Sequence, residues 1–168
     1  MRLTWMLLLL LTMSAWAEDE MLAKAEKSVV LVIRLGYRIH HGDVEIRRLA
    51  SPRVNTRDGT EAEISVGNRP AEGAAAGKDN IKFTVKVTPT VMADNKRVRL
   101  KLAASIERPQ GGPLRQYCQL TGSSGEAVEF SVQPPENDEE YTVEVIPYVV
   151  MPDQKFEGFD KDGKPILR

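Results

Sequence analysis

The sequence predicts a mainly β protein made of antiparallel sheets, arranged as a sandwich, with one short helix near its N-terminus. Apolar and polar residues alternate over most segments after residue 28, which is the period of a half-buried strand. Charged residues stand between the apolar ones, as in antiparallel sheets that have one wet face. Turn residues such as Asp58-Gly59 separate these segments, and a pair of late segments repeats the pattern of an earlier pair.

The N-terminus has the three parts of a secretory signal peptide. Arg2 gives a basic start, residues 7–11 form an unbroken apolar run, and Ala15-Trp16-Ala17 is a small-residue cleavage signature. The apolar run is well short of the ~20 residues that span a membrane, so we expect a cleaved leader over residues 1–17 and not an anchor. The expected location is therefore outside the cytoplasm, in the periplasm or associated with the outer membrane.

After the leader, the chain is expected to form a short helix, one β domain and a tail. Residues 18–27 (EDEMLAKAEK) place acidic residues first and lysines late, which suits the dipole of a helix. Residues 28–151 are the length of one domain and contain all the strongly alternating segments. Residues 152–168 are a polar C-terminal tail, in which Asp162-Gly163 is placed to turn a last hairpin.

The strands of the β domain follow from the alternation. A long strand is expected over residues 28–39, and the next one starts at residues 44–46. The further strands lie at residues 61–66, 83–91, 97–106, 116–120, 128–132 and 141–149. Proline cannot donate a hydrogen bond to a neighbouring strand, so Pro89 and Pro147 are expected near strand ends or on exposed edges.

An internal repeat joins the two halves of the domain. Glu63-Ile64-Ser65-Val66 matches Glu129-Phe130-Ser131-Val132. The segment FTVKVTPTV that begins at Phe83 matches YTVEVIPYV, which begins at Tyr141, with the prolines in register. Any two alternating strands resemble each other, so chance similarity is the alternative. The coincident prolines favour a duplicated hairpin, whose copies are joined through the strand at residues 97–106.

Composition excludes several classes of function. The chain has 168 residues with 23 basic and 24 acidic side chains, a net charge of −1, so it lacks the basic surplus that nucleic-acid binding needs. The single cysteine, Cys118, rules out an internal disulfide. We favour Cys118 as a buried small apolar residue, and an intermolecular link is the alternative in an oxidising compartment.

Catalytic patterns are lacking. His40 and His41 are neighbours on an extended segment and point to opposite faces, so they cannot hold a metal from one side. The serines are in no nucleophile elbow, and Gly122-Ser123-Ser124-Gly125 lacks the lysine of a phosphate loop. Glu61 and Glu63 share a strand face and are interpreted as solvated side chains. We therefore expect no enzyme activity, no cofactor and no metal.

The stretch LASPRVNTRDGTEAEISVG, residues 49–67, together with the strands at residues 83–91 and 98–102, resembles the C-terminal β-domain of bacterial secretins. Secretins are the outer-membrane gate proteins of type II and type III secretion and of type IV pili. The resemblance covers about residues 44–106 and implies a β-module of the cell envelope. The chain departs from the family because little precedes this region, and because the gate and membrane-facing hairpins shrink to residues 68–80. The expectation is a water-soluble relative without a pore of its own.

Two hypotheses follow from these observations. The first is an assembly component that pairs its edge strands with itself or with an envelope complex linked to secretion or pilus machinery. Its candidate strands span residues 61–66 and 126–132, and the candidate residues are Glu61, Glu63, Ser65, Glu129 and Ser131. The second is a monomeric periplasmic ligand- or protein-binding module of inhibitor type. It would use loop residues Arg69, Lys78 and Asp138. Neither involves nucleic acid or a small-molecule cofactor, and neither requires association with the outer membrane.

Overall fold

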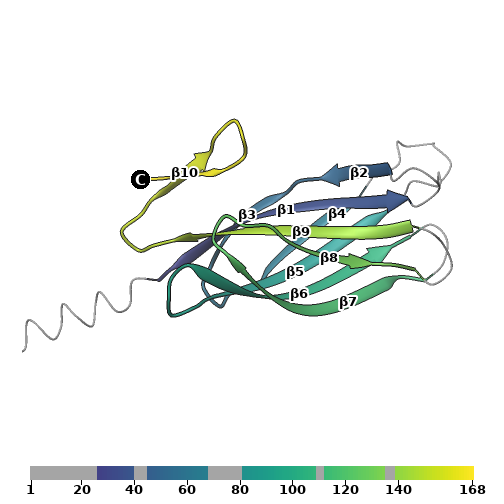
Figure 1. The fold of residues 1–168 in the computed structure, drawn as a ribbon, viewed down its shortest axis with the longest axis horizontal. Helices are drawn as coiled ribbons and strands as arrows, with labels where there is room; N and C mark the ends of the chain where they lie inside the picture. The colour runs from purple at the N-terminus through teal and green to yellow at the C-terminus, as the bar shows by residue number, and fades with distance from the viewer. Residues whose placement is uncertain (1–25, 40–44, 68–80, 109–111, 135–138) are drawn as a thin grey trace, which may run out of the picture.

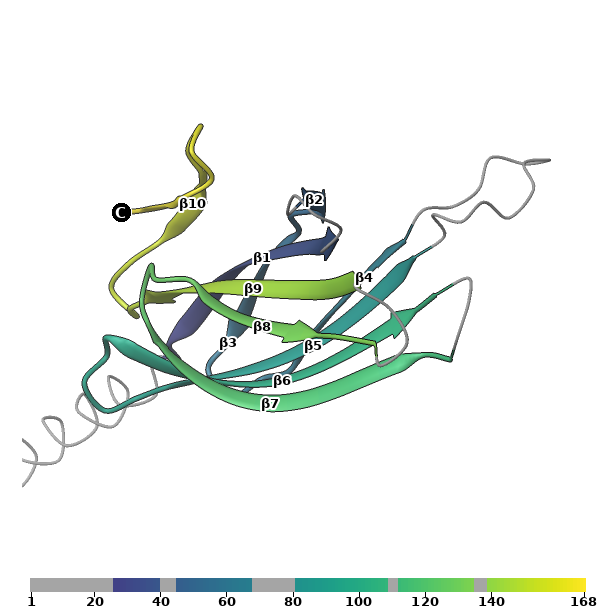
Figure 2. The same ribbon diagram turned by 45° about the vertical axis from the view of Figure 1, so that its right-hand side comes forward.

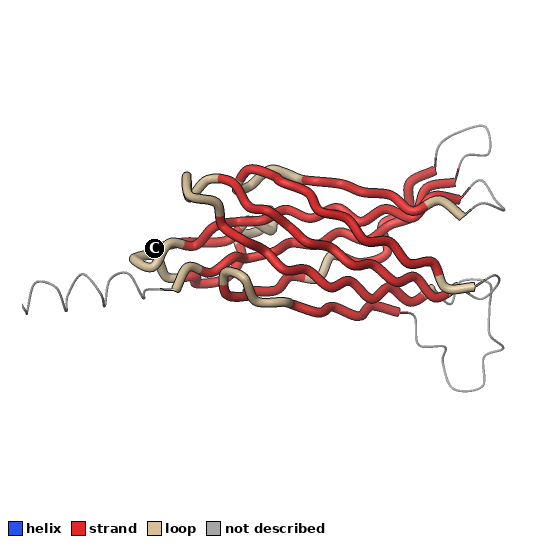
Figure 3. Tube along the Cα trace, turned by 90° about the horizontal axis from the view of Figure 1, so that it is seen from below, coloured by secondary structure: helices blue, strands red, loops and turns tan. Residues whose placement is uncertain are grey.

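The computed structural model describes residues 26–39, 45–67, 81–108, 112–134 and 139–168 (Figure 1). All regular structure in these ranges is β-strand, as Figure 3 shows, so the mainly β prediction is confirmed. The strands are β1 (Ser28–Ile39), β2 (Glu45–Ala50), β3 (Arg53–Arg57), β4 (Ala62–Gly67), β5 (Lys82–Val91), β6 (Arg97–Glu107), β7 (Leu114–Ser123), β8 (Val128–Val132), β9 (Glu139–Val150), β10 (Phe156–Phe159) and β11 (Pro165–Leu167). The expected leader and almost all of the expected helix over residues 18–27 lie outside the described residues.

Two antiparallel sheets face each other, and the hydrophobic core lies between them (Figure 2). The first sheet has the order β2-β1-β9-β8, with β3 also paired to β1, and the second has the order β4-β5-β6-β7. Buried and exposed residues alternate along β5 and β6, which is why the sequence pattern predicts these strands well. At the centre, the rings of Phe83 and Tyr141 meet edge to face, with centroids 6.0 Å apart and planes at 65°.

The repeated hairpin is present, with the same register in both copies. Strand β4 pairs with β5 as β8 pairs with β9. The matching residue pairs are Ala62–Val87 and Val128–Val145, Ile64–Val85 and Phe130–Val143, and Val66–Phe83 and Val132–Tyr141. Because the first hairpin belongs to the second sheet and the second hairpin to the first sheet, the two copies lie on opposite sides of the core. The Phe83–Tyr141 contact therefore joins equivalent positions.

The equivalence extends beyond the hairpins. Strand β1 pairs with β3 and β9 as β6 pairs with β7 and β5. Three cross-strand pairs of the first sheet each have an equivalent in the second: Leu31–Val54 corresponds to Leu100–Leu120, Val29–Val149 to Val98–Val91, and Arg38–Glu140 to Glu107–Lys82. The last two are ion pairs with their charges exchanged, at 3.1 and 3.5 Å. Each sheet thus combines strands from both halves of the chain, so neither half can complete a sheet of this kind by itself.

The two prolines are buried and lie near the C-terminal ends of their strands, Pro89 in β5 and Pro147 in β9, as expected. Pro89 and Pro147 face the side on which the short neighbouring strand has already ended. There, a glycine of positive φ donates its N–H to the proline carbonyl oxygen, Gly59 to Pro89 at 2.8 Å and Gly125 to Pro147 at 2.7 Å. No strand lies opposite the nitrogen of either proline, so the absence of an N–H costs no hydrogen bond between strands.

The C-terminal tail forms a hairpin over the first sheet. Strand β10 pairs with β11, and the turn between them contains Gly163, which has a φ of 79°. Figures 1 and 2 place this hairpin on the side of the first sheet that faces away from the core. Arg53 of β3 lies over the ring of Phe159, 4.5 Å from its centroid. The outer face of the first sheet is therefore largely shielded from solvent next to this hairpin, where Val30 and Val150 are only 0% and 4% exposed.

Among the described residues, no helix has the length and hydropathy that crossing a membrane would require.

Candidate edge-strand interaction site

Both strands that the sequence singles out for pairing lie at sheet edges. Strand β4 is an edge strand of the second sheet, and β8 is an edge strand of the first. Glu63 and Ser65 lie on β4, and Glu129 and Ser131 lie on β8. Glu61 precedes β4 and is exposed. Of the expected edge residues, only Glu61 is therefore outside a strand.

The direction of the backbone groups on β4 follows from a single hydrogen bond. Pro89 accepts from Gly59, so the polar groups of Pro89 face the β4 side of β5. Backbone direction alternates along a strand, so those of Val85 also face β4, where Ile64 is the partner. Glu63 and Ser65 alternate with Ile64, and their N–H and C=O groups therefore point away from the sheet.

The edge of β8 has the same geometry. Gly125 donates to Pro147, so Pro147 and Val143 of β9 direct their polar groups toward β8. Phe130 pairs with Val143, and its neighbours Glu129 and Ser131 consequently direct their N–H and C=O groups outward. The two candidate edges thus offer two equivalent rows of backbone donors and acceptors.

Side chains on these edges bond to their own sheet. The carboxylates of Glu61 and Glu63 lie 3.5 and 3.2 Å from Nζ of Lys86, and these two neighbours raise the pKa of the Lys86 ammonium, chiefly through the hydrogen bond to Glu63. The hydroxyl of Ser65 lies 3.1 Å from that of Thr84. On β8, Glu129 pairs with Arg38 at 3.3 Å. Each carboxylate therefore has a cationic neighbour on its own sheet and stays half exposed, although Glu61 and Glu63 share one lysine and Glu129 shares Arg38 with Glu140.

The loop candidates Arg69, Lys78 and Asp138 lie outside the described residues, as do His40 and His41. In the part of the chain that the structure describes, no three His, Cys, Asp or Glu side chains gather as a metal-binding group. Cys118 has a free thiol, is half buried against the core beside Leu102, and its pKa is raised by burial.

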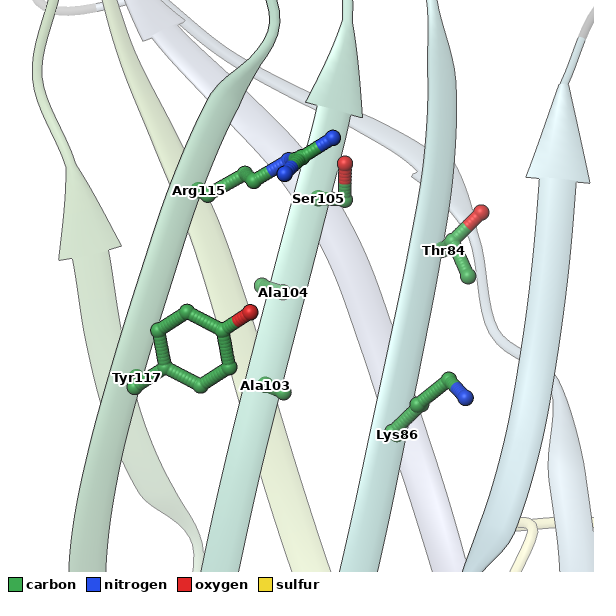
Figure 4. Close-up of a pocket in the computed structure, with 7 residues that line it drawn as sticks. All are labelled: Thr84, Lys86, Ala103, Ala104, Ser105, Arg115 and Tyr117. Carbon is green, nitrogen blue, oxygen red and sulfur yellow. The ribbon is translucent and has the colours of Figure 1, made fainter.

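Sequence reasoning missed a third edge, which is β7. Tyr117 on this strand is 74% exposed, and its ring stands on the outer face of the second sheet (Figure 4). A shallow hollow of about 190 Å³ lies beside it, with Ala103 and Ser105 as its floor and Arg115 and Lys86 at its sides. No local pattern in the sequence marks this strand as an edge. The expectation over residues 116–120 covered five of the ten residues of β7.

A scan against models of protein families finds no match for this sequence, and neither does a comparison with curated proteins. The solved structures that are similar to it include three secretin structures. The type IV competence pilus secretin PilQ of V. cholerae is 14% identical, with a TM-score of 0.38 over 74% of this chain and 57% of that chain. The Salmonella type III secretion injectisome secretin InvG in the open gate state is 10% identical, with a TM-score of 0.35 over 82% and 66%.

The β-barrel secretin domain of InvG is 9% identical, with a TM-score of 0.30 over 75% of this chain and 62% of that chain. The chain thus spans between 57% and 66% of the length of these three structures. These structures are secretins, the family that the stretch over residues 44–106 resembles, and the similarity is weak.

Proposed function

We propose that this chain is a non-enzymatic, exported interaction module that joins its partner by adding strands at the open edges of its sandwich. The observation that carries the proposal is the outward direction of the backbone N–H and C=O groups of Glu63, Ser65, Glu129 and Ser131 on β4 and β8. An unpaired row of this kind is a template for another strand.

The duplication strengthens this proposal because it supplies the edge twice. Strand β4 has six residues and β8 has five, and both keep the same register to their inner neighbours. A partner strand that fits one edge therefore meets the same arrangement of backbone groups at the other. Two equivalent edges on one chain suit a component that links neighbours in an assembly.

The link to an envelope machine rests on the sequence. The stretch over residues 44–106 resembles the β-domain of secretins, and the leader over residues 1–17 is expected to direct export. The solved secretins that resemble the chain are described as parts of a competence pilus and of a type III injectisome. We extend to this chain the association with secretion or pilus machinery, as part of the proposal.

Proline substitution tests the edges directly. The N–H groups of Ser65 and Ser131 face outward, so Ser65→Pro and Ser131→Pro should remove a donor for the incoming strand and spare the bonds to β5 and β9. We expect both variants to fold, as judged by circular dichroism, and to lose capture of envelope partners from extracts. Ser65→Ala and Ser131→Ala keep the N–H and are the matched controls. Folded proline variants that capture partners as well as the wild type would contradict the proposal.

A monomeric binding module is the second candidate. It is favoured by the glutamates on the two edges, since charged residues discourage pairing, and by the hollow beside Tyr117. This alternative predicts a monomer at every concentration and a ligand whose affinity falls on Tyr117→Ala. The variants separate the two candidates: strand addition predicts loss of capture on Ser65→Pro or Ser131→Pro, whereas the binding module predicts loss of affinity on Tyr117→Ala alone.

A further inference from the structure

We propose that β7 is a self-association edge, on which a second copy of this chain pairs antiparallel, with Gln119 on the two-fold axis. The pairing joins the second sheets of two copies into one continuous sheet. This inference rests on the proposed function, which is strand addition at open sheet edges. It adds a third edge to β4 and β8 and names a second copy of the chain as the partner at that edge.

The β7 edge is long and regular. Strand β7 has ten residues, whereas β4 has six and β8 has five. It ends the second sheet, and it pairs with β6 without a register shift from Ser123, opposite Arg97, to Leu114, opposite Ile106. A strand of this length offers a second copy a full ladder, and no bulge bends it away.

Backbone direction on β7 follows from the bonds within the sheet. The N–H of Met92 donates to the carbonyl of Arg97 at 2.9 Å, so the polar groups of Arg97 face β5. Alternation along β6 then turns those of Leu100 toward β7, where Leu120 is its partner. The next residue, Gln119, therefore directs its N–H and C=O to the open side. Every second residue along the strand does the same, namely Arg115, Tyr117 and Thr121.

This edge lacks the usual protection against pairing. Natural edge strands carry lysines, prolines, bulges or repeated charges. Strand β7, with the sequence LRQYCQLTGS, has one charged residue, Arg115, and neither lysine nor proline. By contrast, strand β3, which is the equivalent of β7 in the first sheet, carries two charged residues, Arg53 and Arg57, on its open side.

A second copy fits this edge because the strand is complementary to itself. With Gln119 opposite Gln119 of the second copy, Tyr117 meets the second copy's Thr121, an aromatic and β-branched pair that stabilises antiparallel strands. Arg115 meets the second copy's Ser123, so the two like charges stay at opposite ends of the ladder.

The inner face gains as well. Cys118 and Leu120, which are half buried at the margin of the core, come to lie opposite each other between the two copies. The residues that one copy leaves partly exposed are therefore covered by the same residues of the other. An unrelated extended peptide offers no such match, and it is kept as an outcome of the test below.

Cysteine cross-linking reads the register. Residues that exchange hydrogen bonds across antiparallel strands have Cα atoms about 5.5 Å apart, which is within the range that a disulfide bridges. In a Cys118→Ser background, Gln119→Cys should give a reducible dimer on mild oxidation. The matched control is Thr121→Cys in the same background. Its two cysteines lie about 13 Å apart along the strand in this register, so it should stay monomeric on a non-reducing gel.

Solution mass gives the second measurement. The mature chain should elute at twice its monomer mass, and Gln119→Pro should halve that mass while the circular dichroism spectrum is kept, because the N–H removed faces outward. A wild-type monomer at high concentration overturns the inference, as does equal cross-linking of the Gln119 and Thr121 variants. A monomer whose capture of an envelope protein is lost on Gln119→Pro also overturns it, since the occupant is then another chain.

These outcomes are distinct from failure of the proposed function. If the chain is monomeric and Ser65→Pro or Ser131→Pro abolishes partner capture, the inference about β7 falls and the proposed function stands. If the Gln119→Cys dimer forms while no envelope partner is recovered and the β4 and β8 variants behave as wild type, the inference stands and the strand-addition role of β4 and β8 falls.

Discussion

Replacing Phe83 with alanine is the sharpest test of the core. Phe83 is 1% exposed and meets Tyr141, itself 2% exposed, edge to face at 6.0 Å. Phe→Ala at a buried site costs about 3–5 kcal/mol of unfolding free energy, because the lost apolar transfer is joined by the cost of a cavity. The aromatic pair itself accounts for about 0.5–1.5 kcal/mol of this. A domain near the middle of the ordinary stability range, about 10 kcal/mol, would remain folded but with a much lower midpoint.

Urea titration followed by circular dichroism measures this loss. We expect the midpoint to fall with little change in slope, since the slope follows the surface exposed on unfolding. Lys82→Ala is the matched control on the outer face of the same strand. Its side chain is half exposed and lies 3.5 Å from Glu107, so the free energy of unfolding should change by less than about 0.5 kcal/mol. Equal losses for Phe83→Ala and Lys82→Ala would refute the assignment of faces.

A double-mutant cycle isolates the contact between the two halves of the repeat. Phe83→Ala and Tyr141→Ala should be non-additive by about 0.5–1.5 kcal/mol, because the two rings touch. Additive losses would mean that the rings pack independently.

Three further predictions follow from individual contacts. A hydrogen bond to the side chain of Arg97, and to a lesser extent hydrogen bonds to backbone N–H groups, lower the pKa of the Asp94 carboxyl to about 2. The ionised carboxylate therefore stabilises the folded state above about pH 4, and this stabilisation is lost as the pH falls toward 2. Asp94→Asn should remove this part of the pH dependence of the urea midpoint. Burial raises the pKa of the Cys118 thiol, so a disulfide reagent at pH 8 should modify it more slowly in the folded chain than in urea. Arg53→Ala removes the contact with the Phe159 ring and should cost about 0.5–1 kcal/mol in the same titration, with faster proteolysis of the C-terminal hairpin.

The sequence predicted the strands best where one face is dry and the other wet. Alternation is unbroken over β5 and β6, and the structure shows the same alternation in burial. It predicted the ends of β7 poorly, because Gln116 and Gly122 interrupt the apolar pattern there. The tail was expected to be polar, with a hairpin turn at Asp162-Gly163, and the structure adds that this hairpin contacts the first sheet through Phe159 and Arg53.

For the candidate site, the sequence singled out two strands that lie at sheet edges, but it did not give the direction of their backbone groups. The glutamates and serines of β4 and β8 read as outward in the pattern, and both strands are sheet edges. Which strand is an edge is a property of pairing between distant segments, and local periodicity carries no information about it. The open edge of β7 was missed for this reason.

What the sequence determined by itself is the local part of the structure. The alternation of Phe83, Val85 and Val87 with polar neighbours specifies a half-buried strand, and the prolines in register favour a duplicated hairpin. Only the tertiary structure decided that these hairpins lie in different sheets and bring Phe83 and Tyr141 together across the core. The physical reason is that a strand's period depends on its own residues, whereas its neighbour is chosen by the burial that a complete sandwich provides.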